Sequence, residues 1–234
     1  MSSPTRRRIY LMRHGSVSYF DTSGKPYPPE SVPLNEQGRI QASAAGKVFA
    51  NGCVQFDRVI VSGLPRTMET AQRVLTETGQ QIALEPWPDL QELKGGKLAA
   101  IADADLKEAF TGAFEGVVPE HKQFLGGETI GALLDRVYPA IDRLRTDTTW
   151  DTVLLVLHGG VNRAILSYAL TGQRLYLGNL AQTAGCINVL DLGETASDCV
   201  VRMMNFAPPA TLQADYRGTT MEALLDQYRK FRGL

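Results

Sequence analysis

Two histidines of this sequence directly follow runs of bulky apolar residues. The run Ile9-Tyr10-Leu11-Met12 leads through Arg13 to His14, the run Val153-Leu154-Leu155-Val156-Leu157 leads to His158, and a glycine comes next in both cases. Such runs are typical of buried strands in an open α/β sheet, which carries its reactive groups at the strand ends. An imidazole fixed there, with the guanidinium of Arg13 beside it, is suited to nucleophilic attack on an anionic substrate.

Two further side chains could complete such a site. Ser62-Gly63-Leu64-Pro65 turns the chain from a strand into a helix and places Arg66 near the helix N-terminus, where free N–H groups and the helix dipole favour anions. Glu92 lies in Leu90-Gln91-Glu92-Leu93, and a carboxyl partly withdrawn from water is suited to general acid catalysis. The alternative interpretations are a surface arginine and a solvated glutamate.

The remaining pattern predicts the elements that position these residues. Segments with helical spacing run over 35–52, 65–79, 128–144 and 161–172, and Pro139 is expected to kink or divide the third of them. Short apolar strands are expected at 9–12, 56–61, 82–84, 153–157, 187–192 and 200–206, and a capping box at Thr219 to Glu222 begins a terminal helix. This order predicts an α/β fold with a mostly parallel central sheet flanked by helices.

We expect one three-layer domain over residues 1–234, with two segments near the site. Residues 16–33 contain Gly24 and several prolines, which disfavour regular structure. Tyr19, Phe20 and Tyr27 would give this loop an apolar wall against a substrate, although a packed surface loop is an equal alternative. Residues 94–127 are of mixed character, and we expect them to form a short lid insertion.

Composition limits the classes of partner and cofactor. The formal net charge is −1, which provides no field to attract nucleic acid or an anionic membrane. The three cysteines lack metal-ligand spacing and are an odd number, so we expect no disulfide framework, no metal and a reducing compartment. No apolar run approaches the roughly 20 residues of a membrane span. These features favour a cytoplasmic protein that binds a small molecule and needs no cofactor, and a homodimer is compatible with them.

The ordered motifs resemble those of the histidine phosphatase superfamily, which has the phosphoglycerate mutase-like fold. The resemblance extends from residue 9 to about residue 190 and is carried by Leu11-Met12-Arg13-His14-Gly15, residues 34–42, 62–71 and 90–93, Gly127-Glu128-Thr129 with Arg136, and residues 156–163. It implies that His14 becomes phosphorylated, that Arg13, Arg66 and Gly159 bind the phosphoryl oxygens, that His158 completes the pocket and that Glu92 donates a proton.

Two departures from the family pattern have consequences. Val17 occupies a position where many members have Ser or Thr, so Ser16 and Ser18 are candidates for auxiliary phosphate contacts. Only 33 residues lie between Glu92 and Gly126, fewer than in the insertion of the cofactor-dependent mutases. A shorter lid gives water easier access to phosphohistidine and favours hydrolysis over transfer.

The sequence therefore predicts a metal-independent phosphomonoester hydrolase, a histidine acid-type phosphatase, which acts on a small phosphorylated metabolite. A cofactor-dependent phosphoglycerate mutase is the first alternative. A catalytically silent module that binds a phosphorylated ligand is the second, although a pure binder has no need of two imidazoles.

Overall fold

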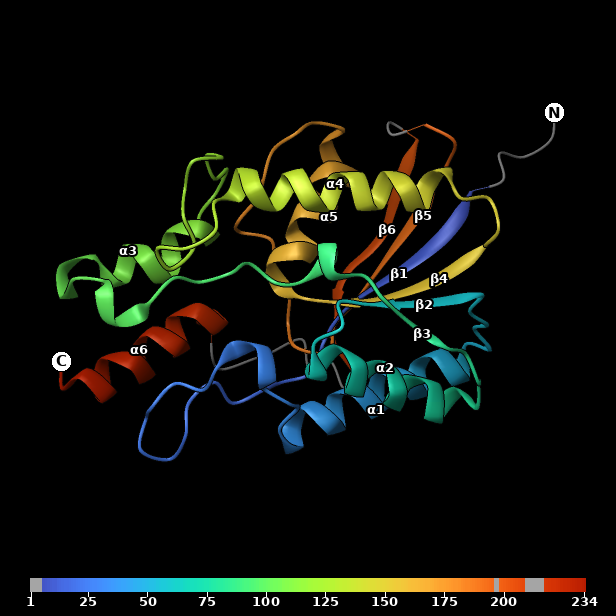
Figure 1. Cartoon of the computed structure of the whole chain (residues 1–234). Coiled ribbons are helices and arrows are strands. Elements are labelled where there is room, and N and C mark those ends of the chain that lie inside the picture. Colours follow the sequence, from blue (N-terminus) through green and yellow to red (C-terminus); the bar gives the residue numbers. More distant parts are fainter. Residues whose placement is uncertain (1–5, 196–197, 209–216) are drawn as a thin grey trace.

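A six-stranded sheet with the order β3-β2-β4-β1-β5-β6 forms the centre of the computed structural model (Figure 1). The structure describes residues 6–195, 198–208 and 217–234. The strands are β1 (Arg7–Arg13), β2 (Arg58–Val61), β3 (Leu84–Pro86), β4 (Thr152–Leu157), β5 (Ile187–Leu192) and β6 (Cys199–Phe206). The first four of these are mutually parallel and the last two are antiparallel additions, which confirms the mostly parallel α/β sheet.

Helices cover both faces of the sheet and make the predicted three layers. Helices α1 (Glu36–Asn51) and α2 (Pro65–Thr78) pack on one face, and α4 (Ile130–Thr146) and α5 (Gly159–Thr171) on the other (Figure 1). Alternate residues of β1 face the two helix layers. Met12 packs in the core beneath α1 and α2, and Leu11 packs in the core beneath α4 and α5. None of the helices in the described ranges is long and apolar enough to cross a lipid bilayer.

Most element boundaries agree with their local signals. Asn35 caps α1 by accepting the Gly38 N–H at 2.8 Å, and Thr219 with Glu222 forms the predicted capping box of α6 (Thr220–Arg232). Strand β3 lies two residues later than expected, because its register is set by pairing of Leu84 with Val59 of β2. The segment 94–127 contains only one short helix, α3 (Leu106–Thr111), and several single 3-10 turns.

Pro139 does not divide α4, which corrects one of the two expectations for this residue. The helix is continuous from Ile130 to Thr146 (Figure 1). Leu133 and Leu134 before the proline and Ile141 and Leu144 after it are all buried in the same core. This shared burial holds both halves of the helix against the sheet despite the hydrogen bond that the proline removes.

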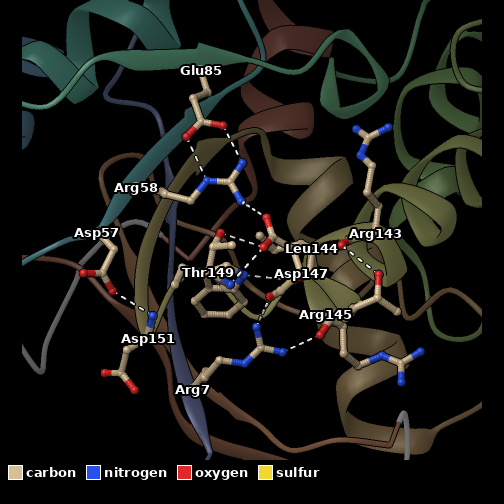
Figure 2. A network of polar contacts seen from close by, with 12 residues as sticks. Arg7, Asp57, Arg58, Glu85, Arg143, Leu144, Arg145, Asp147, Thr149 and Asp151 are labelled. Carbon is tan, nitrogen blue, oxygen red and sulfur yellow. Dashed lines mark hydrogen bonds and ion pairs between the residues drawn. The ribbon is translucent and has the colours of Figure 1, made fainter.

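A polar network (Figure 2) lies at the edge of the sheet where β1 begins at Arg7 and β2 at Arg58. The histidines follow the opposite ends of their strands. Arg58 donates to the carboxylates of Glu85 at 2.8 Å and Asp147 at 2.7 Å. Arg7 donates to the carbonyl oxygens of Asp147 and Arg145. The network therefore fixes the turn between α4 and β4 to β1, β2 and β3.

We expect Arg58→Met to reduce the free energy of unfolding by about 1–3 kcal/mol, because it leaves two partly buried carboxylates without their shared donor. Chemical denaturation measures this loss, and kcat/KM should stay unchanged. Arg143→Met is the matched control: that side chain is 57% exposed and lies 3.7 Å from Asp89, so its loss should be well below about 1 kcal/mol. Equal losses in the two variants would contradict the role given to Arg58.

Candidate active site

The ends of β1 and β4 bring His14 and His158 together. The strands are parallel neighbours with Arg13 opposite Leu157, and the His14 N–H donates to the Leu157 carbonyl at 3.0 Å. The two ring centroids are 5.1 Å apart, and the residues are only 2% and 0% exposed. The two histidines, which the sequence places at similar strand ends, therefore lie next to each other.

The hydrogen bonding of His14 determines which ring nitrogen is available. Nδ1 lies 2.7 Å from the carbonyl oxygen of Gly15, which can only accept, so Nδ1 carries the proton and the lone pair is on Nε2. Burial, followed by the charges of Arg66 and Arg13, lowers the pKa of His14 well below its usual value. The imidazole is therefore neutral and has the lone pair that a nucleophile needs.

Gly15 is required by the close approach of α1 to this turn. A side chain on Gly15 would place its Cβ 2.3 Å from the carbonyl oxygen of Gly38, and one on Gly38 would lie 2.1 Å from the Ser16 oxygen. These contacts leave no room for a methyl group at either position. The first turn of α1 is thus packed directly against the backbone that follows His14.

His158 takes the opposite tautomer through a chain of hydroxyl groups. Its Nε2 is 2.8 Å from Ser62 Oγ, and Ser62 Oγ is 3.0 Å from Thr67 Oγ1. Because Thr67 already donates to the Leu64 carbonyl at 2.9 Å, Ser62 donates to Thr67 and accepts from His158. Burial, then His14 and the arginines, lowers the pKa of His158. Its Nδ1 is thus an unprotonated atom without a partner among the described residues.

Arg13 and Arg66 are held by neutral acceptors. Arg13 Nη1 donates to the Gln182 carbonyl at 2.5 Å and to Thr220 Oγ1 at 3.3 Å, and Arg66 Nη1 donates to the Pro29 carbonyl at 2.7 Å. In the described part of the chain no carboxylate forms an ion pair with either, and both Nε atoms are buried without an acceptor. Buried donors of this kind call for an anionic acceptor.

Glu92 lies at the N-terminus of α5, next to this cationic group. Both of its carboxylate oxygens are 3.1 Å from the Gly160 nitrogen, and one accepts the Leu93 N–H at 3.0 Å. A side chain on Gly160 would meet that oxygen at 2.5 Å, so only glycine permits this approach. The structure thus brings Glu92 to the end of β4 that carries His158.

Arg136 of α4 positions the segment that carries Glu92. Its guanidinium also pairs with Glu128 at 2.7 Å. Its other N–H groups donate to three backbone carbonyls of this segment, those of Asp89 at 2.7 Å, Gln91 at 2.6 Å and Glu92 at 3.2 Å. The resemblance includes Arg136 without assigning it a role, and its function here as a backbone clamp depends on contacts distant in sequence.

Arg163 is a third unpaired guanidinium, which sequence reasoning did not identify as a site residue. Its Nη1 donates to the Gly159 carbonyl at 3.0 Å, and its guanidinium carbon lies 4.9 Å from the centroid of the Phe114 ring. It forms no ion pair within the described ranges, and burial lowers its pKa. The only available signal was its position one helical turn after Gly159.

A cavity of about 620 Å³ adjoins these groups. Its wall includes Arg13, Arg66, Glu92, Gly159 and Arg163 at one end. It also includes the three aromatic residues of the loop 16–33 that were expected to face a substrate, namely Tyr19, Phe20 and Tyr27. His14 and His158 are buried and are not among the lining residues, whereas their chain neighbours Arg13 and Gly159 are.

The two candidate auxiliary serines each accept a hydrogen bond from Asn35. Ser16 Oγ and Ser18 Oγ lie 3.3 and 3.4 Å from the Asn35 side-chain nitrogen, and neither residue lines the cavity. Their contact with phosphate stays a prediction. Within residues 6–195, 198–208 and 217–234, no group of His, Cys, Asp and Glu side chains is arranged to hold a metal ion.

Comparisons with known proteins agree with this geometry. A family model described as the histidine phosphatase superfamily (branch 1) matches residues 9–205. Phosphoglycerate mutase-like protein 4 of Arabidopsis thaliana is 28% identical over 185 residues, 71% of this chain and 72% of that protein. Adenosylcobalamin/alpha-ribazole phosphatase of Salmonella typhimurium is 27% identical over 194 residues, 80% and 91% respectively. Mycobacterial glucosyl-3-phosphoglycerate phosphatase has a similar structure, with a TM-score of 0.66 at 25% identity over 86% of this chain and 99% of that one.

Nuclear magnetic resonance of the ring nitrogens tests the two tautomers. At pH 6 we expect His14 to be neutral with its proton on Nδ1 and His158 to be neutral with its proton on Nε2, since the pKa of each is lowered. The urea-unfolded chain is the control, because its histidines should have a pKa of about 6.5. A protonated imidazolium at either position in the folded, ligand-free protein at pH 6 would contradict the assignment.

Arg163→Met should weaken the binding of inorganic phosphate by about tenfold, equivalent to about 1.4 kcal/mol, because it removes an unpaired cation from the cavity wall. Isothermal titration calorimetry measures the Kd. Arg202→Met removes a guanidinium of β6 that pairs with Asp191 of β5 outside the cavity wall, and it should leave the Kd unchanged. An unchanged Kd for Arg163→Met would remove this residue from the anion site.

Proposed function

The chain belongs to the histidine phosphatase superfamily, branch 1, and we propose that it hydrolyses a small phosphorylated metabolite without a metal ion, through a phosphohistidine at His14. One observation carries the proposal. A neutral imidazole with its lone pair on Nε2 lies in a site where the buried Nε atoms of Arg13 and Arg66 have no acceptor among the described residues. A phosphoryl group offers an electrophilic phosphorus to the first and oxygen acceptors to the second.

In the first step, His14 Nε2 attacks phosphorus while the ester P–O bond breaks. Arg13 and Arg66 donate to the equatorial oxygens, where negative charge is spread during transfer, and the N-termini of α2 and α5 add favourable dipoles. Glu92, in its protonated form, gives its proton to the departing alcohol oxygen. The products of this step are the free alcohol, a Glu92 carboxylate and a phosphorylated His14.

In the second step, water attacks the phosphorus of phosphohistidine. Glu92 removes a proton from this water as the P–N bond breaks, which restores the lone pair of His14 Nε2 and the protonated Glu92. His158 Nδ1, which is unprotonated and has no partner in the described ranges, is available to accept a hydrogen bond from the attacking water. General acid and base catalysis of this kind contributes about 10²–10⁴ in rate.

The proposal includes the domain organisation expected from the sequence. Residues 1–234 form one domain in which the segment 94–127 acts as a short lid, and Lys94, Leu98, Phe110, Phe114 and Phe124 of that segment line the cavity. A cytoplasmic location and a homodimer are further parts of the proposal. Sedimentation equilibrium of the purified protein measures the number of subunits.

A phosphoglycerate mutase is the second candidate, favoured by the 28% identity to a phosphoglycerate mutase-like protein. It would use the same phosphohistidine but return the phosphoryl group to another hydroxyl of a sugar acid. Incubation with 3-phosphoglycerate and a priming bisphosphate separates the two. A mutase forms the isomer with little free phosphate, whereas the proposed hydrolase releases phosphate.

We expect the protein to release phosphate from p-nitrophenyl phosphate in the presence of a chelator, and His14→Ala to abolish this release. With ethyl phosphate, whose alkoxide leaving group needs a proton, Glu92→Gln should reduce kcat by about 10²–10⁴, because the leaving oxygen is no longer protonated. Glu36→Gln, at an exposed glutamate in the first turn of α1, is the matched control and should retain the full rate.

Two outcomes would reject parts of this mechanism. Unchanged release by a folded His14→Ala protein would exclude His14 as the nucleophile. A Glu92→Gln rate within a factor of about two of the unsubstituted protein would assign the proton transfer to another group.

A further inference from the structure

The cavity beside the arginines is much larger than a phosphoryl group requires. Its volume is about 620 Å³, which lies within the range of about 300–1,000 Å³ found for pockets that enclose drug-sized ligands. Only the end formed by Arg13, Arg66, Glu92 and Gly159 is suited to the phosphoryl oxygens. If the proposed function holds, the remaining space must receive the alcohol that leaves.

The wall of this remaining space is mainly apolar and aromatic. Three segments distant in sequence contribute to it, and the residues that carry the argument are Tyr19, Phe20, Phe110, Phe114, Met221 and Leu224. Away from the arginines, the charged residues of the wall are Glu30, Lys94 and Lys97, all exposed to solvent. A polyol or a second carboxylate would lose water here for few polar partners, whereas an aromatic group would bury apolar surface.

Helix α6 completes the wall and is fixed by aromatic contacts. Tyr228 stacks on Phe110 with ring centroids 5.8 Å apart and lies 6.4 Å from the Phe20 ring. These contacts hold α6 beside α3 (Figure 1). In this position Met221 and Leu224 line the cavity.

The part of this wall that α6 contributes lies outside the matched family pattern. The family model ends at residue 205, whereas α6 begins at Thr220. The identity of the leaving alcohol therefore does not follow from the relatives and has to be inferred from the cavity itself.

We propose that the cavity selects phosphomonoesters whose alcohol carries an aromatic ring system. The inference rests on the proposed function, because the phosphoryl end of the cavity must be the place of hydrolysis. The ring system lies between the aromatic residues of the loop 16–33, the lid 94–127 and the apolar side chains of α6.

Two substrates with the same type of leaving oxygen test the inference. Ethyl phosphate and 2-(1-naphthyl)ethyl phosphate are both esters of primary alcohols and differ in the ring system. We expect kcat/KM to be at least about 100-fold higher for the naphthyl compound, since a single methylene in an apolar pocket already accounts for about 10–200-fold. The glycerate ester 3-phosphoglycerate should be hydrolysed no faster than ethyl phosphate.

Substitutions in α6 locate the selectivity. Met221→Gln and Leu224→Gln should each lower the naphthyl-to-ethyl ratio by about tenfold, chiefly through KM. Met204→Gln makes the same chemical change as the first variant on β6, where the side chain is 44% exposed and outside the cavity wall. It should leave the ratio unchanged, and circular dichroism confirms that each variant is folded.

The possible outcomes separate this inference from the proposed function. A ratio near one in an enzyme that hydrolyses both esters would overturn the inference and leave the phosphatase proposal intact. If neither ester is hydrolysed, the Kd of each is measured by calorimetry in His14→Ala. At least tenfold tighter binding of the naphthyl ester would support the inference while the proposed function fails, and equal affinities would overturn it.

Discussion

Three guanidinium groups without carboxylate partners are the constraint on which this site depends. Each is held in place by a backbone carbonyl, so that Arg13 donates to Gln182, Arg66 to Pro29 and Arg163 to Gly159. A carbonyl orients a guanidinium without neutralising it, and the charge therefore remains available to a ligand. The charges of Arg13 and Arg66 also contribute to lowering the pKa of both imidazoles. Arginine positioning and histidine nucleophilicity are thus consequences of one arrangement.

The opposite edge of the sheet uses arginine differently. There Arg58 is paired with Glu85 and Asp147, and Arg8 with Asp191 (Figure 2 for the first pair). Arg58 lowers the pKa of Glu85, so this pair stabilises the fold above the usual pKa of that carboxyl and loses its effect as the pH falls below it. Unpaired buried charge costs stability. Paired arginines thus stabilise the sheet at this edge, whereas Arg13, Arg66 and Arg163 at the opposite edge have no carboxylate partner in the described ranges.

The sequence predicts those parts of the site that depend on local signals. His14 and His158 follow recognisable buried strands, and Arg66 follows a proline that begins a helix, so their meeting at one sheet edge could be expected. The bond between His158 and Ser62 spans 96 residues, and no periodicity within either segment indicates it. The clamp from Arg136 to the segment before Glu92 was not predictable for the same reason. Pro139 was misjudged because burial of both helix halves outweighs a local hydrogen bond.

Chemistry and selectivity are thereby drawn from different parts of the chain. Every side chain assigned to phosphoryl transfer lies within residues 9–205, the range matched by the family model, whereas part of the apolar wall comes from α6. A direct link between a phosphate-binding residue and α6 is the 3.3 Å hydrogen bond from Arg13 Nη1 to Thr220 Oγ1 in the first turn of the helix. An alcohol that packs against Met221 also packs beside this turn. The packing of the alcohol against α6 can therefore affect the orientation of Arg13. Binding of the leaving alcohol and binding of the phosphoryl group are coupled through this hydrogen bond.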